Sequence, residues 1–201
     1  LGKLYLNQAR LDSTARQARE GARQDTDSPQ AAVALENALL NLRQATLMSP
    51  ARFEAWEALG VLYKEIQGAP GATEWGLKAF ETAISLSPNN PRLYTELGML
   101  YLDKEQFEDA KDQFEKALAL SPGFADALLW QALLQEKEGN PDKALSLLEK
   151  LILDNPLRED ILFQLGRMYY NKGRFEEAEV LFRRVLLLAL AIPTPTILWG
   201  S

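Results

Sequence analysis

The fold is decided most clearly by residues 91–124, which read PRLYTELGMLYLDKEQFEDAKDQFEKALALSPGF. Apolar residues recur in this stretch at the three- and four-residue spacing of an amphipathic helix, first over about 13 residues and again after a short polar break. Asn90 followed by Pro91 is typical of a helix start, because an Asn side chain can cap the first turn and the first helical position accepts Pro. The stretch therefore predicts two helices joined by a tight turn.

The same pattern recurs along the chain with a period of 34 residues. The string Leu-Gly-x-x-Tyr occurs four times, beginning at Leu1, Leu59, Leu97 and Leu165. Residues of three kinds keep the period in the second half of each segment, namely Pro88, Pro122 and Pro156; Ala110, Ala144 and Ala178; and Phe80, Phe114, Leu148 and Phe182. A single helix pair cannot bury its own apolar face, so a period of this length predicts a stack of pairs that share a core.

Composition excludes several classes of function. The chain has 201 residues, a net charge of -6, no His and no Cys. Acidic character disfavours nucleic-acid binding, and the missing residue types remove thiol catalysis, imidazole acid–base chemistry and nearly every zinc site. No Gly-Lys-Ser/Thr follows the glycines at 68–76, so a phosphate-binding loop is not expected. We therefore predict no enzyme activity, no cofactor or metal, and no small-molecule substrate.

These residues resemble the tetratricopeptide repeat (TPR), whose pattern has Leu-Gly and Tyr on a first helix, and small, aromatic and small residues with a closing Pro on a second. Residues 91–124 match throughout. Residues 125–158 depart from the pattern, with Ala132 where Gly is usual and Gln135 where Tyr is usual. The resemblance implies an all-α fold, a right-handed solenoid of antiparallel helix pairs.

The predicted organisation is one TPR-like superhelix over residues 1–190 and an irregular tail over residues 191–201. Four full repeats are expected, at residues 53–90, 91–124, 125–158 and 159–190. Residues 1–52 are interpreted as an incomplete repeat with a long insertion. Because the chain begins inside a repeat, we predict that it is a region of a longer protein, and its degenerate, acidic repeats resemble bacterial TPR proteins.

The resemblance also implies a binding surface, because the first helices of a TPR array line a concave groove. Inward positions predict a groove with an apolar and aromatic centre and a charged rim, which suits a peptide or helix of a partner protein. The predicted groove residues are Arg92, Thr95, Met99, Leu102, Leu129, Leu133, Glu136, Phe163, Arg167 and Tyr170. Leu, Met and aromatic residues at helical spacing are equally typical of a core, so both interpretations stay open.

A second class of function also stays open. The chain could be a structural spacer or self-association module of a larger bacterial protein, attached to a membrane-embedded parent domain and without a free ligand. Residues 185–192 are apolar on all faces, so self-association is expected to use this last helix. The segment itself is expected to be soluble, on either the cytoplasmic or the extracytoplasmic side of a bacterial membrane.

Overall fold

The computed structural model describes residues 29–66 and 71–191, and every regular element in these ranges is an α-helix. The chain divides into two compact units, Leu1–Pro122 and Gly123–Ser201, which are described separately below. Unit 1 contains α2 (Pro29–Met48), α3 (Phe53–Glu65), α4 (Ala72–Leu86), α5 (Pro91–Asp103) and α6 (Phe107–Leu120). Unit 2 contains α7 (Ala125–Lys137), α8 (Pro141–Asp154), α9 (Glu159–Asn171) and α10 (Phe175–Ala191).

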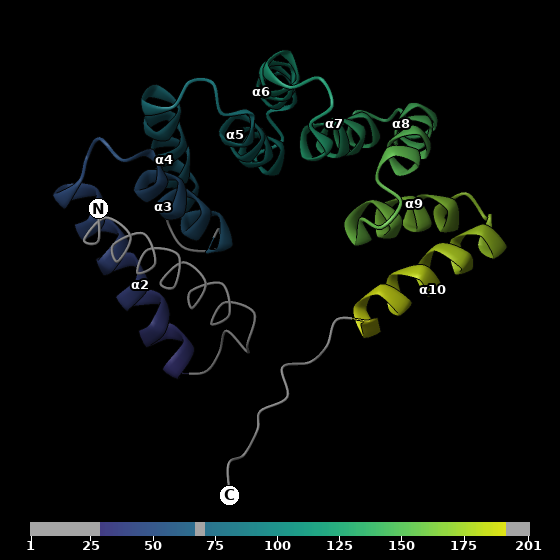
Figure 1. Cartoon of the computed structure of the whole chain (residues 1–201), viewed down its shortest axis with the longest axis horizontal. Helices are drawn as coiled ribbons and strands as arrows, with labels where there is room; N and C mark the ends of the chain where they lie inside the picture. The colour runs from purple at the N-terminus through teal and green to yellow at the C-terminus, as the bar shows by residue number, and fades with distance from the viewer. Residues whose placement is uncertain (1–28, 67–70, 192–201) are drawn as a thin grey trace, which may run out of the picture. The chain divides into compact units, whose positions relative to one another are not determined.

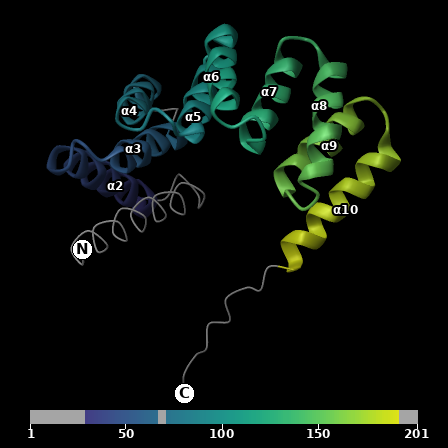
Figure 2. The ribbon, with the colours of Figure 1, turned by 45° about the horizontal axis from the view of Figure 1, so that its top comes forward.

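Consecutive helices form pairs within each unit. In unit 1, α3 pairs with α4 and α5 with α6; in unit 2, α7 pairs with α8 and α9 with α10 (Figures 1 and 2). Neighbouring pairs pack through α4 against α5 and through α8 against α9, and α2 packs against α3. The predicted all-α solenoid of helix pairs is therefore confirmed.

One left-handed residue makes the turn inside each pair. These residues are Gly71, Glu105, Gly139 and Gly173, with φ between 59° and 83°. In the turn of α7 and α8, the N–H of Asn140 donates to the carbonyl of Gln135 at 2.8 Å and closes the end of the first helix. Gly139 and Gly173 adopt this conformation without the steric cost that a Cβ atom would add. Glu105 takes the same conformation at a cost that glycine avoids.

Two helices begin with an Asn-Pro pair, and the two starts differ in detail. Asn90 caps α5, because its side chain accepts a hydrogen bond from the N–H of Arg92 at 3.1 Å. Asn140 precedes Pro141 at the start of α8, but its side chain makes no such bond. Its ψ is 60°, against 104° for Asn90, so the two residues enter their helices with different backbone geometry.

Each helix pair closes where a small residue on the first helix meets a large one on the second. A Cβ atom placed on Gly60 would lie 2.9 Å from Phe80, one on Gly98 2.6 Å from Phe114, and one on Gly166 2.9 Å from Phe182. The third pair has Ala132 and Leu148 at the matching positions, and both are fully buried. Ala132 stands where the other pairs have Gly, and the facing residue, Leu148, is smaller than the Phe of the other pairs.

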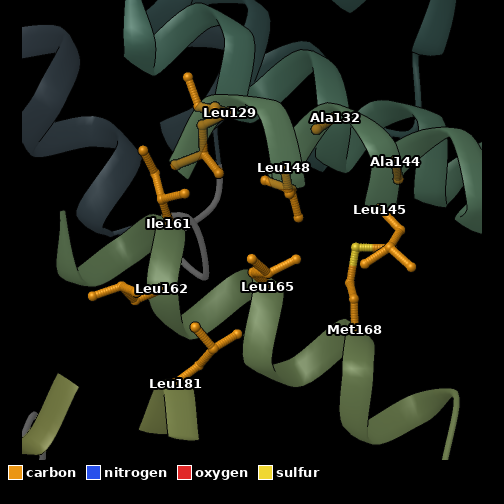
Figure 3. Close-up of a cluster of buried hydrophobic side chains, with 11 residues drawn as sticks. Leu129, Ala132, Ala144, Leu145, Leu148, Ile161, Leu162, Leu165, Met168 and Leu181 are labelled. Atoms are coloured by element: carbon orange, nitrogen blue, oxygen red, sulfur yellow. The ribbon is translucent and has the colours of Figure 1, made fainter. Parts of the chain in front are cut away.

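The core of unit 2 fixes α9 in place. Leu129 of α7, Leu148 of α8 and Leu165 of α9 belong to one buried cluster (Figure 3). On α9 the cluster takes Ile161, Leu162, Leu165 and Met168, which lie on one side of that helix. The other side of α9 is therefore left for contacts outside this core.

Several predictions fall on the ends of the chain. Residues 1–28, which hold most of the expected insertion, lie outside the described residues, and so does the predicted tail beyond residue 191. Helix α10 continues to Ala191. Within the described residues, none of the helices combines the length and the apolar character needed to cross a membrane.

Candidate functional site on the first helices

Three of the ten predicted groove residues are buried, namely Thr95, Leu102 and Leu129. The Thr95 hydroxyl donates to the carbonyl of Pro91 at 3.0 Å, within its own helix. Leu129 belongs to the core of unit 2. These three side chains therefore contribute to packing and offer little surface to a ligand in this structure.

In unit 2 an aromatic strip follows one face of α9. Phe163, Arg167 and Tyr170 stand four and three residues apart, so they share that face. The side chains of Phe163 and Tyr170 are 48% and 59% exposed. Each ring is supported from α10: Phe163 lies 5.8 Å from the ring of Phe182, and Tyr170 lies edge-on at 5.2 Å to Phe175. The strip is therefore both accessible and held in position.

A bidentate ion pair lies between these two aromatic residues and joins α9 to α7. Arg167 donates from Nη1 to Oε1 of Glu136 at 2.9 Å and from Nη2 to Oε2 at 2.5 Å. Its Nε donates to Gln164 at 2.9 Å. The hydrogen bond to Glu136 raises the pKa of Arg167, and partial burial of the guanidinium only partly opposes this. The charged group is thus fixed in a single orientation.

Leu133 completes the surface from α7. It lies one turn before Glu136 and is half-buried against the core of unit 2. We call the five residues Leu133, Glu136, Phe163, Arg167 and Tyr170 the unit 2 groove surface. Five of the ten predicted residues are thus brought together, on two first helices.

A second ion pair joins the same two helices near the start of α9. Arg158 donates from Nη1 to Asp126 of α7 at 2.6 Å and from Nε to Asp160 at 2.9 Å. The hydrogen bonds to Asp160 and Asp126 raise the pKa of Arg158, against the effect of its partial burial. Charged pairs therefore hold α7 and α9 together at two points along their length.

The corresponding surface of unit 1 is charged and carries no comparable aromatic strip among the described residues. Nε of Arg92 lies 3.1 Å from Oε1 of Glu57, and Nζ of Lys64 lies 2.5 Å from Oε2 of Glu96. The same Nζ lies 4.0 Å from the sulfur of Met99. The predicted residues Arg92 and Met99 are therefore placed among ion pairs that connect α3 with α5.

The ion pairs were the part of the site that the sequence analysis did not foresee. We predicted an apolar and aromatic centre with charges only at the rim. In the structure, the partly buried ion pair of Arg167 and Glu136 lies between the aromatic residues Phe163 and Tyr170. A usable signal exists, because Lys64 and Glu96 are opposite charges 32 residues apart, and so are Asp126 and Arg158. Both spacings are close to the length of one repeat, which places one charge on a first helix and the other on the next first helix or directly before it.

The chemistry of these surfaces is that of binding. They offer aromatic and aliphatic contact, guanidinium donors and carboxylate acceptors. Within residues 29–66 and 71–191, no three acidic side chains come together in a way that could hold a metal ion.

Comparison with known proteins gives matches over much of the chain. Two family models, both described as tetratricopeptide repeat, match residues 95–151 and 135–190. Protein O-mannosyl-transferase Tmtc3 of Drosophila melanogaster is 35% identical over 98 residues, which are 48% of this chain and 11% of that protein. Protein O-mannosyl-transferase TMTC3 of Homo sapiens is 30% identical over 159 residues, 77% of this chain and 17% of that protein. The chain thus spans less than a fifth of the length of these relatives, and the activity in their names is theirs.

Solved structures give the same fold. A tetratricopeptide repeat protein from Parabacteroides merdae superimposes with a TM-score of 0.66 and 20% identity, over 91% of this chain and 75% of that one. An identity this low shows the fold alone. The helix pairs, their 34-residue spacing and the two family matches agree, and this chain belongs to the tetratricopeptide repeat family.

Proposed function

We propose that this chain is a protein-interaction scaffold, and that its unit 2 groove surface binds a peptide or helix of a partner protein. Family membership supports the general scaffold role. The observation that carries the finer proposal is the pair of half-exposed aromatic side chains, Phe163 and Tyr170, on either side of Arg167. Aromatic residues and Arg dominate the binding energy of protein interfaces. The proposal includes no catalytic step.

The spacing of the aromatic pair sets what the partner must present. Residues seven apart on a helix lie about 10 Å apart along its axis. Two apolar side chains of a helical partner at the same spacing, or three residues apart in an extended segment with the polyproline II conformation, share one face and match that distance. The Arg167–Glu136 pair between them offers both a donor and an acceptor to the partner's polar groups. Both a helix and an extended segment therefore fit.

In this proposal, unit 1 contributes additional contacts to a bound partner. Its ion pairs, Glu57 with Arg92 and Lys64 with Glu96, already engage the charged groups on α3 and α5. Arg92 remains largely exposed and Met99 half-exposed, so both can add contacts at the edge of a bound partner. Thr95 and Leu102 support the helices from within.

The first prediction concerns this surface. Changing Leu133→Asp together with Phe163→Asp should weaken capture of a partner by about thirtyfold or more, since a central aromatic anchor contributes at least about 2 kcal/mol. The measurement is affinity capture from lysate, followed by titration of the recovered partner against the purified chain.

The control is the matched change Leu153→Asp with Leu157→Asp, two exposed leucines of the same unit that lie outside the groove surface. This control should retain the partner. Because Leu133 also contacts the core, a second variant, Phe163→Asp with Tyr170→Asp, repeats the test at two exposed positions. If all variants retain their helicity and capture the partner as well as the wild type does, the proposal is wrong.

A second candidate function is self-association, and the exposed apolar surface of α10 favours it. Leu186 and Leu190 share one side of α10 and are 58% and 72% exposed. Leu186 also borders a hollow of about 400 Å³ lined on α9 and α10 by Tyr170, Phe175 and Phe182. Exposed apolar surface of this kind marks interaction sites. A second copy of the chain is the occupant in this alternative, and attachment to a larger membrane protein stays a prediction from the resemblance.

The second prediction separates this alternative from the first. Leu186→Glu with Leu190→Glu should raise the dimer dissociation constant by about tenfold or more, because two charges would enter an apolar contact. Sedimentation velocity over a range of concentrations measures it. Leu187→Glu, on another side of α10 and equally exposed, is the control and should dimerise as the wild type does. A wild-type chain that stays monomeric at every concentration contradicts the alternative.

A further inference from the structure

A hollow of about 550 Å³ lies in unit 1 between α2, α3 and α4. Its walls include Arg43 and Leu47 of α2, Trp56 and Tyr63 of α3, and Trp75 and Lys78 of α4. Its volume falls in the range of ordinary ligand sites. None of the ten predicted groove residues lines it, so it is a surface separate from the proposed groove.

Arg43 is fixed in the hollow with part of its donor capacity unused. Its Nε and Nη2 atoms donate to the hydroxyl of Tyr63 at 2.9 and 2.6 Å. The guanidinium carbon also lies 5.8 Å from the centre of the Tyr63 ring. A guanidinium has five N–H groups, so three remain without a hydrogen-bond partner among the described residues. Arg43 is thus an oriented cation that can still bind a carboxylate.

Lys78 supplies a second positive charge. Its ammonium lies 5.1 Å from the centre of the Trp75 ring, and it forms no ion pair with any described residue. The other polar groups nearby are engaged locally: the Trp56 indole donates to the Pro50 carbonyl at 2.9 Å, and the Thr82 hydroxyl to the Lys78 carbonyl at 2.8 Å. The side-chain groups left for a ligand are therefore hydrogen-bond donors.

The charge of the hollow is opposite to that of the chain. The whole chain carries a net charge of -6, yet among the described residues that line the hollow there are two cations and no carboxylate. The site therefore favours an anion, and its two cations have no competing acid in the lining.

The apolar part of the hollow defines the rest of the ligand. Leu47 is 81% exposed and Trp75 is 53% exposed, so a bound segment would cover a large aliphatic and a large aromatic side chain. Covering such residues is favourable in proportion to the apolar area removed from water. The lining spans three helices at the surface, which suits a segment of a larger partner.

We propose that this hollow binds an acidic peptide segment of a second protein, with a carboxylate on Arg43 and Lys78 and an apolar side chain against Trp75 and Leu47. The site gives the scaffold a second docking surface that does not depend on the unit 2 groove.

The test uses the full chain and a fluorescein-labelled ten-residue peptide of alternating Asp and Leu, with binding followed by fluorescence anisotropy. Lys78→Glu should weaken binding by about tenfold or more, because it replaces an attractive charge with a repulsive one. The matched control is Lys116→Glu on α6, which makes the same charge change at an exposed lysine and should leave the affinity within about twofold. Lys78→Arg keeps the charge and should bind as the wild type does.

Two further arms decide what the site recognises. Replacing each Asp of the peptide with Asn should also weaken binding by about tenfold or more. Leu133→Asp with Phe163→Asp should leave it unchanged, which separates this proposal from the unit 2 groove. The proposal is overturned if the wild type does not bind the peptide, if Lys78→Glu and Lys116→Glu weaken it equally, or if the Asn peptide binds as well. Competition by inorganic phosphate at the peptide's own concentration would overturn it too, because the site would then recognise a simple anion.

Discussion

Replacing Phe114 with alanine should lower the free energy of unfolding by about 3–5 kcal/mol, the usual cost of removing a buried aromatic ring. Phe114 is fully buried, and a Cβ atom placed on Gly98 would lie only 2.6 Å from Cε1 of its ring. The helix pair of α5 and α6 therefore closes over this ring. Urea denaturation followed by circular dichroism measures the loss.

Gly98→Ala provides the control through a double-mutant cycle. In the wild type it should cost about 1–3 kcal/mol, because the added methyl group would overlap a ring that has no room to move. In the Phe114→Ala background the same change should be neutral or stabilising, since the methyl group enters the cavity and alanine favours a helix by about 1 kcal/mol over glycine. An equal cost in both backgrounds would show that the two residues are not in contact.

Leu148→Ala should lower the free energy of unfolding by about 2–5 kcal/mol. Leu148 has no exposed surface and lies in the cluster that joins α7, α8 and α9 (Figure 3). Its removal leaves a cavity where three helices meet, so the structure has little freedom to collapse around it. The same denaturation experiment applies.

The matched control is Leu153→Ala on the same helix. Leu153 is 78% exposed, so its truncation should change the free energy of unfolding by no more than about 0.5 kcal/mol. Comparable losses at the two leucines would contradict the placement of the core of unit 2, because both changes remove the same atoms from the same helix.

Much of the fold follows from local sequence. A glycine between two helical stretches, as at Gly139 and Gly173, is a local signal for a left-handed turn, and both turns are present, because few residues other than glycine adopt that backbone conformation without cost. Gly98 likewise lets two helices approach closely, because its missing Cβ leaves room for the ring of Phe114. At Asn140 the local pattern was a weaker guide, since its side chain does not cap the helix it precedes.

The candidate site was less accessible to sequence reasoning. Positions on the first helices could be assigned to the inner face, yet Thr95, Leu102 and Leu129 are buried there while Phe163 and Tyr170 are exposed. Exposure depends on what neighbouring helices bring against each position, and the repeat pattern does not record that. The cationic hollow of Arg43 and Lys78 was missed for the same reason, because its residues come from three helices.

The sequence by itself determined the repeat, the helix pairs, their turns and the small residues that let them close, because each depends on residues within a few positions or one period of each other. Only the tertiary structure decided which charges form pairs, which aromatic side chains remain exposed and where a hollow opens. These features depend on side chains from helices up to 39 residues apart in the chain, as with Arg43 and Thr82 around the hollow. Their geometry is set by packing, which periodicity alone leaves undefined.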